Sequence, residues 1–187
     1  EKPVCAVAED SQRLFHRARQ GPGVCGFTFN NLYREENQAV IGRVLAGEIG
    51  ELEWIELAWL RRKHVPDKPW MKDPAKAGGG VLADLGSHLL AIGLHLIAHR
   101  RSFSAECHLI RRDPSRSPVE DVAIAHVILN GSIPVLLRAG WGMPMDDPVR
   151  VEIRAHGRQG TAANTDYQGQ RYDGYRTLIR RFFQAIV

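Results

Sequence analysis

Four strand-like segments follow one another in the second half of the chain, with no helical pattern between them. They cover Ser104–Ile110, Asp121–Leu129, Ile133–Trp141 and Val149–His156. The dipeptide Asn130-Gly131 lies between two of these segments, and it favours the tight turn of a β-hairpin. Strands that follow one another through short turns pair antiparallel, whereas parallel neighbours need a long crossover. This half of the chain therefore predicts a mainly antiparallel sheet.

Helical patterns gather mostly in the first half. They cover Val4–Gln20, Glu36–Ala46 and Val81–His99, and a last one closes the chain over Tyr172–Val187. Two further strand-like segments, Val24–Phe29 and Glu51–Leu60, lie among the early helices, and residues 61–79 form a long loop. This order predicts an α+β fold, a mainly antiparallel open sheet with helices packed on one face, rather than a doubly wound sheet.

The length and composition fit a single soluble domain over residues 1–187. That length is enough for one sizeable core, and 44% apolar with 25% charged residues excludes a disordered or fibrous chain. The longest uncharged apolar run, Leu85–Ile97, contains two histidines and is shorter than a membrane span needs. We therefore expect no membrane partner. The chain opens on Glu1 without an apolar leader, so we expect a mature product, a trimmed chain or a fragment.

Charge and cysteine content point away from two other classes of protein. The net charge of +4 comes partly from basic clusters such as Arg61-Arg62-Lys63 and Arg111-Arg112, which are scattered and have no interleaved aromatic residues. Solvated turns and helix ends explain them better than a nucleic-acid surface does. Cys5, Cys25 and Cys107 are odd in number, far apart and form no Cys-x-x-Cys pair. We expect a reducing, cytoplasmic location, with neither a disulfide framework nor a zinc site.

The segment Gly21–Gly26 matches the G-x-G-x-x-G pattern of dinucleotide-binding loops. That loop must follow a strand and open a helix, so that the helix N-terminus holds the pyrophosphate. Here a helical pattern precedes the glycines and a strand-like segment follows them. The sequence therefore predicts a plain helix-to-strand turn, not a nucleotide site.

The apolar helix predicted after Gly78-Gly79-Gly80 carries two polar residues, Asp84 and His88, at i and i+4. That spacing puts both side chains on one helix face. Burying a carboxylate and an imidazole is costly unless they satisfy one another or serve a site. One interpretation is a structural pair that ties the helix to the glycine loop; the other is a histidine base oriented by the carboxylate. A metal site with His95 is not expected, because i+11 lies about 16 Å along the helix axis.

Several local motifs together resemble one known family. They are Glu1-Lys2-Pro3, the stretch from Asn30 to Arg34, Val44–Gly50, the long pattern Gly78–His88 with Trp70 and Asp73 before it, Val119-Glu120-Asp121, Asn130-Gly131 and Gly157–Thr161. Their order and type resemble the glucose–fructose oxidoreductase / inositol dehydrogenase / MocA (Gfo/Idh/MocA) family, over essentially the whole chain. Gly78–His88 resembles its G-G-G-x-x-x-D-x-G-x-H signature, which is long and specific.

The resemblance implies a C-terminal substrate-binding and oligomerisation domain of an oxidoreductase that uses NAD or NADP. In that family an N-terminal Rossmann domain binds the dinucleotide and ends just before the E-K-P segment, so it would be absent from this chain. The resemblance implies that Lys2 and Pro3 contact the cofactor and that Lys2 also contacts the substrate oxygen. Asp84 and His88 would bind a sugar, polyol or related secondary alcohol, with His88 as general acid/base. This chain alone would be inactive.

The apolar strands suggest a second role. Trp54, Trp59, Trp141 and the alternate aliphatic residues exceed what a few helices on one face can cover, so the other face is expected to pack on a second copy. A tryptophan buried inside the monomer core is the alternative for each. The competing function is a non-catalytic dimerisation or binding module of the same fold. Retention of Lys2, Asp84 and His88 together argues against it.

Overall fold

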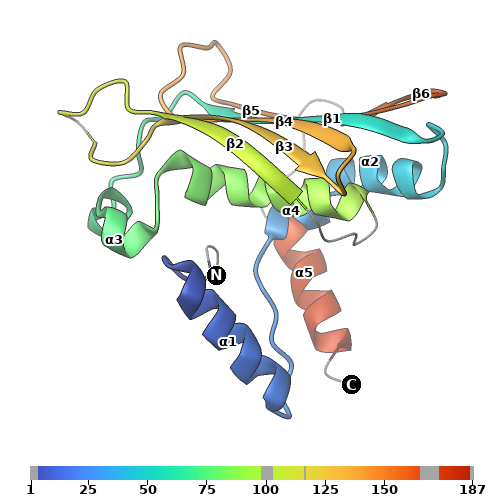
Figure 1. Cartoon of the computed structure of the whole chain (residues 1–187), viewed down its shortest axis with the longest axis horizontal. Coiled ribbons are helices and arrows are strands. Elements are labelled where there is room, and N and C mark those ends of the chain that lie inside the picture. Colours follow the sequence, from blue (N-terminus) through green and yellow to red (C-terminus); the bar gives the residue numbers. More distant parts are fainter. Residues whose placement is uncertain (1–3, 98–102, 116, 165–172, 186–187) are drawn as a thin grey trace.

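One open sheet of six strands organises the molecule, in the order β2-β3-β4-β1-β5-β6 (Figure 1). The computed structural model describes residues 4–97, 103–115, 117–164 and 173–185. The strands are β1 (Leu52–Arg61), β2 (Phe103–Ile110), β3 (Val122–Leu129), β4 (Ile133–Gly140), β5 (Val149–Gly157) and β6 (Gly160–Ala163). All five strands expected from Glu51 onward are confirmed, and β6 is an addition.

The sheet is mixed, because its central pair runs parallel. β1 lies parallel to β4, while every other neighbouring pair is antiparallel. Asn130 and Gly131 both adopt positive φ angles, of 54° and 73°, in the turn between β3 and β4. The expected hairpin is therefore confirmed. β1 comes first in the chain but inserts between β4 and β5, which no pattern in the sequence indicated.

Helices cover only one face of the sheet, which we call the inner face; the opposite one is the outer face (Figure 1). α4 (Ser87–Leu96) packs on β1 and β4, and α2 (Glu35–Leu45) packs on α4, β5 and β6. The short α3 (Pro74–Ala77) lies in the expected loop 61–79. Together these elements bury the core, which includes Leu57, Leu89, Leu137 and Ile153. The α+β fold with helices on one face is confirmed.

Three of the four tryptophans, Trp54, Trp59 and Trp141, divide between the two faces of the sheet. Trp59 and Trp141 lie on the inner face, where Trp141 is completely buried. Trp54 lies on the outer face, is 37% exposed and stacks on His156. Alternation along a strand explains the split, because successive side chains point to opposite faces. The core alternative is therefore correct for Trp59 and Trp141, and only Trp54 belongs to the face expected to meet a second copy.

Two helices and a connecting segment project from the helix-covered side of the molecule as an arm, formed by α1 (Ala8–Gln20), residues 21–29 and α5 (Asp173–Gln184) (Figure 1). The arm corrects one expectation, since Val24–Phe29 is extended but pairs with no strand. This segment packs between the two helices of the arm instead. The Phe27 ring lies 5.0 Å from the Phe15 ring of α1, measured between centroids, and Gly26 lies against Phe182 of α5. The helix expected from Val4 begins at Ala8.

The apolar stretch before β2 belongs to the core. Among the described residues, Pro74–Leu96 is long and apolar enough to cross a membrane by length and composition alone. Half of its most apolar window is buried in this fold, where α4 packs on the inner face. Its apolarity is what a helix covering a sheet requires.

Candidate functional site

The glycine loop that precedes α4 is held by one buried carboxylate. Glu120 accepts hydrogen bonds from Gly80 N (2.8 Å) and Leu82 N (3.1 Å), and its own carbonyl accepts one from Val81 N. A Cβ at Gly80 would overlap the Glu120 carbonyl oxygen, and one at Gly78 would lie 2.8 Å from Ala6. The glycines therefore allow two neighbouring segments to approach the backbone closely. This contact fixes where the following helix starts.

The helix begins with one π-helical turn, Leu82–Gly86, which continues into α4. Single π turns of this kind occur often at functional sites, because they shift side chains relative to a regular α-helix. Asp84 lies in the π turn and His88 in the first turn of α4. Both residues predicted from the sequence are thus carried by a locally irregular segment at the start of the core helix.

Asp84 faces β1, where it pairs with Arg61. The distance from Arg61 Nη2 to Asp84 Oδ2 is 3.6 Å, and the two side chains are 25% and 17% exposed. The guanidinium of Arg61 lies over the Trp141 ring, 5.7 Å from its centroid. Burial lowers the pKa of Arg61, and the charge of Asp84 opposes that shift. The site therefore contains a mostly buried ion pair that sits against an aromatic face.

His88 faces the same patch of β1. It is 5% exposed, and its ring lies 5.4 Å from Trp59 and edge-on to Phe29 at 5.8 Å, measured between centroids. Trp59 and Arg61 are two residues apart on one strand and share the inner face. Asp84 and His88 therefore contact neighbouring inner-face positions of β1. The aromatic contacts restrict the His88 ring to few orientations.

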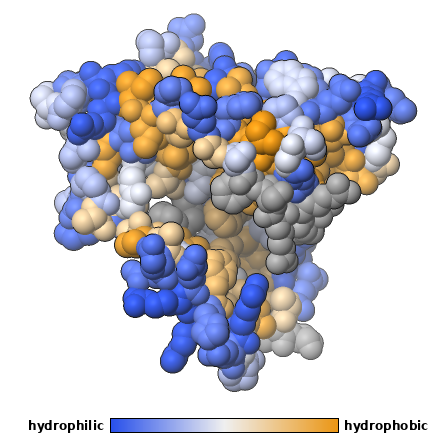
Figure 2. Space-filling view, viewed as in Figure 1, coloured by the Kyte–Doolittle hydropathy of each residue, from blue (hydrophilic) through white to orange (hydrophobic). Residues whose placement is uncertain are grey.

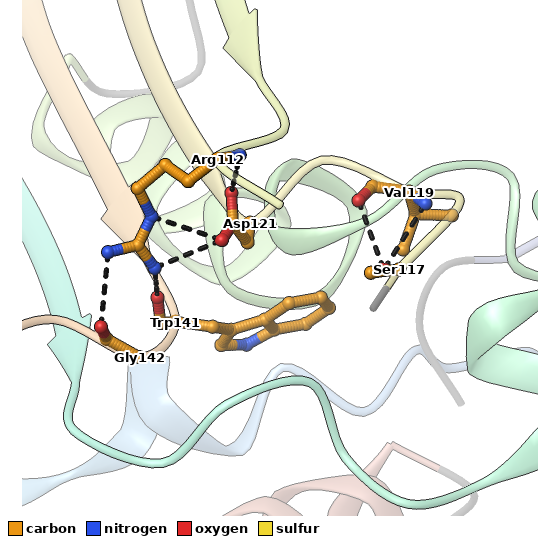
Figure 3. Close-up of polar contacts among 6 residues, drawn as sticks. All are labelled: Arg112, Ser117, Val119, Asp121, Trp141 and Gly142. Atoms are coloured by element: carbon orange, nitrogen blue, oxygen red, sulfur yellow. Dashed lines mark hydrogen bonds and ion pairs between the residues drawn. The ribbon is translucent and has the colours of Figure 1, made fainter. Parts of the chain in front are cut away.

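A second arginine secures the end of β4 under this patch (Figure 3). Arg112 donates from its backbone N to Asp121 Oδ1 and from its Nε to Asp121 Oδ2, both at 3.0 Å. Its Nη1 donates to Gly142 O at 3.1 Å, and its Nη2 donates to Trp141 O. Trp141 N in turn donates to Asp121 O at 2.8 Å. These bonds fix the Trp141 backbone, and with it the ring beneath Arg61.

Sequence reasoning missed the roles of Arg61, Arg112 and Glu120. The two arginines belong to basic clusters that were expected at solvated turns. Arg112 is exposed in the loop after β2, as expected, whereas Arg61 is mostly buried on β1, which corrects the expectation for that residue. The alternating pattern of β1 places Arg61 on the buried side with Leu57 and Trp59, and this was the available signal. The partner of Glu120 is 40 residues away in the chain, so no local pattern indicated it.

Three N–H donors on the inner face have no acceptor among the described residues. They are Trp59 Nε1, Arg61 Nε and Trp141 Nε1, all buried. A buried donor left without an acceptor costs about 1–3 kcal/mol. An oxygen-rich ligand or ordered water at this patch would remove that cost.

A small cavity of about 20 Å³ lies on the other side of Asp84, beside Gly79, Gly80, Ala83 and Trp70. Ala6 lies against Gly78, so the N-terminal segment reaches this side of the site. Lys2 and Pro3, implied as cofactor contacts, fall outside the described residues. The structure therefore places Asp84 and His88 but does not place the third expected residue.

The described residues contain neither a metal centre nor a dinucleotide cradle. Within those ranges no three His, Cys, Asp or Glu side chains gather as metal ligands. Gly21–Gly26 ends α1 and leads into the extended part of the arm, so no helix N-terminus follows it to hold a pyrophosphate. This part of the polypeptide therefore does not fit a dinucleotide on its own.

Comparisons with known proteins give a consistent result. Residues 38–163 match the model of the GFO/IDH/MocA C-terminal domain. A protein of Amycolatopsis mediterranei, named as an oxidoreductase subunit of UDP-kanosamine synthase, is 30% identical over 87% of this chain and 49% of its own length. The scyllo-inositol 2-dehydrogenase (NADP(+)) of Bacillus subtilis is 26% identical over 91% of this chain and 45% of its own. The chain thus spans about half the length of these curated relatives.

Solved structures share the fold. GenD2 from gentamicin A biosynthesis, in complex with NAD, superposes with a TM-score of 0.86 at 17% identity, over 100% of this chain and 60% of its own. An inositol dehydrogenase homologue from Azotobacter vinelandii, complexed with NADH and myo-inositol, gives a TM-score of 0.78 at 18% identity, over 99% of this chain and 58% of its own. At 17–18% sequence identity, this structural similarity shows a shared fold and nothing further.

Proposed function

Because the chain belongs to the Gfo/Idh/MocA family through that family's C-terminal domain, we propose that it is the substrate-binding and oligomerisation domain of an NAD(P)-dependent oxidoreductase. The substrate is a sugar, a polyol or a related secondary alcohol. The observation that carries the proposal is that Asp84 and His88 contact two inner-face residues of β1, Arg61 and Trp59, which are two positions apart. A domain used only for assembly has no need of that pair.

The names of the relatives support the substrate class and the cofactor. One is named for an inositol and NADP(+), and one solved neighbour was crystallised with NADH and myo-inositol. The three unpaired donors Trp59 Nε1, Arg61 Nε and Trp141 Nε1 suit the many oxygen atoms of such a molecule.

The residue types match the oxidation of an alcohol. A base must take the hydroxyl proton, and an imidazole nitrogen of His88 is the group for that step. Asp84 holds a fixed negative charge beside it and accepts a hydrogen bond from a neighbouring hydroxyl. Lys2 supplies a cation that stabilises the developing alkoxide, as the family resemblance implies. A nicotinamide, when bound by the rest of the polypeptide, supplies the hydride acceptor.

The arm is the proposed docking surface of a dinucleotide-binding domain. α1 has no buried residue, and exposed apolar side chains gather along it and α5, namely Val7, Leu14, Phe15, Val24, Tyr175, Ile179, Phe182 and Phe183. A groove of about 630 Å³ runs between α5 and residues 24–28. Figure 2 shows hydrophobic surface beside the hydrophilic side of α1. The relatives are about twice as long as this chain, which leaves room for such a domain.

The outer face is the proposed contact with a second copy of the chain. Ile124 and Trp54 are exposed there, on either side of the Arg138–Glu152 ion pair, which spans the central strand β1. Exposed apolar side chains on a sheet face often mark a contact with another protein chain. Ile124→Asp should turn an oligomer into a monomer in sedimentation velocity runs. Leu45→Asp, at an equally apolar and exposed position on the helix side, should leave assembly unchanged.

The test of the proposed activity is an assay of the full-length polypeptide with NAD⁺ or NADP⁺ and a panel of inositols, glucosides and nucleotide sugars. Formation of reduced nicotinamide with a subset of the panel is the expected result. Binding of these compounds without turnover of any would favour the non-catalytic module instead.

A further inference from the structure

The contact between Arg61 and Asp84 is an ion pair without a hydrogen bond. Charge-assisted N–H···O bonds are about 2.7–2.9 Å long, whereas the closest approach between these two groups is 3.6 Å. The two side chains come from different elements, β1 and the π turn before α4. Their attraction is strong for its distance, because both lie mostly out of solvent, where the effective dielectric is low.

The other surroundings of Arg61 hold it in place but do not neutralise it. Its guanidinium lies over the completely buried Trp141 ring, and its Nε has no acceptor among the described residues. Met143 N donates to the Arg61 backbone carbonyl at 2.9 Å, which fixes the strand end. The carboxylate of Asp84 is the counter-charge that the described residues bring to this guanidinium.

We propose that Arg61 is a positioning residue, which holds the Asp84 carboxylate on the inner face, on the side of β1 that His88 also contacts. The inference rests on the proposed function and adds a role for Arg61 at the same site. Arg112 supports the arrangement from below, because its bonds to Asp121 and the Trp141 carbonyl fix the ring on which Arg61 lies (Figure 3).

The alternative role for Arg61 is direct substrate binding, and kinetics separates the two. A residue that only binds substrate raises KM and leaves kcat unchanged when it is removed. Removing a residue that positions the Asp84 carboxylate lowers kcat and also raises KM, because Asp84 accepts a hydrogen bond from a substrate hydroxyl. Removing an oxyanion-hole donor lowers kcat about 10²–10³-fold, so a residue one contact further away should cost about 10–100-fold.

The experiment compares Arg61→Met, Arg61→Gln and Arg61→Lys in the full-length polypeptide, with kcat and KM measured for the substrate found in the panel. We expect the two uncharged variants to lower kcat about 10–100-fold with a smaller rise in KM, and Arg61→Lys to recover most of the loss. Arg62→Met is the matched control, because Arg62 is the next residue in the chain and its exposed side chain bonds only to the Asp146 carbonyl in the described structure. It should keep the kcat of the unaltered protein.

The outcomes are distinguishable. A higher KM with unchanged kcat in Arg61→Met and Arg61→Gln would assign Arg61 to substrate binding and overturn the inference. Equal loss in Arg61→Lys would show that the charge is not what matters and would overturn it too. No turnover by the unaltered polypeptide would overturn the proposed function, and this inference with it. Melting temperatures of all variants separate these effects from a failure to fold.

Discussion

Strand β1 carries a tryptophan–histidine pair on each of its two faces, and the two pairs differ in almost every other respect. On the inner face Trp59 meets His88 at a 43° tilt, with Asp84 and its arginine close by. On the outer face Trp54 stacks flat on His156, with 4.1 Å between ring centroids and a 7° interplanar angle. The inner histidine comes from a helix and the outer one from a neighbouring strand.

The two histidines also differ in the groups that they contact. Outer His156 is already engaged, because Thr161 Oγ1 lies 3.2 Å from its Nδ1 and Glu56 lies 3.8 Å from its Nε2. Such cross-strand contacts stabilise a sheet surface. Inner His88 is held by aromatic contacts beside unpaired donors and a buried ion pair. The outer pair therefore belongs to the sheet surface, whereas the inner pair lies at the proposed substrate site.

Replacing each histidine gives the largest expected contrast. His88→Ala should lower kcat of the full-length polypeptide about 10²–10⁴-fold, the usual contribution of a general acid/base. His156→Ala should leave kcat within about twofold. Steady-state assays with the best substrate of the panel measure both. Equal losses in the two variants would remove the distinction between the faces.

Core packing gives the next largest contrast. Leu57 is completely buried on the inner face, so Leu57→Ala should lower the free energy of unfolding by about 2–5 kcal/mol. Leu60 is on the outer face of the same strand and only partly buried. Leu60→Ala should cost clearly less, about 1 kcal/mol. Denaturant unfolding measures both, and a larger loss at Leu60 would mean that the outer face is buried in the assembled protein.

Replacing Glu120 tests how much the contact between this carboxylate and the glycine loop contributes to the free energy of unfolding. Glu120→Gln keeps the shape but puts an NH₂ group opposite one of two backbone donors, Gly80 N or Leu82 N. We expect a loss of about 1–3 kcal/mol in unfolding free energy. Asp113→Asn, at an exposed loop carboxylate that bonds Ser115, is the control and should cost less.

The smallest effect concerns two thiols, one in the sheet and one in the arm. Burial, and next the charge of Glu120, raise the pKa of Cys107, so a smaller fraction of this thiol is ionised at pH 8. Cys25 is exposed on the arm. Because the thiolate is the reacting form, Cys25 should be alkylated several times faster than Cys107. Mass spectrometry of timed samples measures the two rates, and unfolding in denaturant should make them equal.

Patterns along the chain predicted most of the fold but not its exceptions. Strands β2 and β5 alternate apolar and polar residues over most of their length, and β3 and β4 are apolar runs joined by the Asn130-Gly131 turn. β6 has four residues and opens on Gly160, so it offers too short a pattern. Val24–Phe29 has strand-like composition, but its apolar side chains pack on the arm rather than in a sheet, and composition does not distinguish the two.

The candidate site was predictable where its residues are close in the chain. Asp84 and His88 are four residues apart, so helical spacing was enough to bring them together. Arg61, Arg112 and Glu120 join the same region only through the sheet order, in which β1 inserts between β4 and β5. That order depends on tertiary packing, which single-sequence patterns do not contain.

The position of β1 also sets the order in which this domain can be assembled during synthesis. Residue 55 pairs with residue 135 on one side and with residue 155 on the other, so the strand leaves the ribosome long before either neighbour exists. The β3–β4 hairpin, by contrast, can close as soon as it is made. Long-range pairing of this kind slows folding and leaves apolar strands uncovered meanwhile. The nascent chain therefore passes through a stage in which its future central strand is open to aggregation or to chaperone binding.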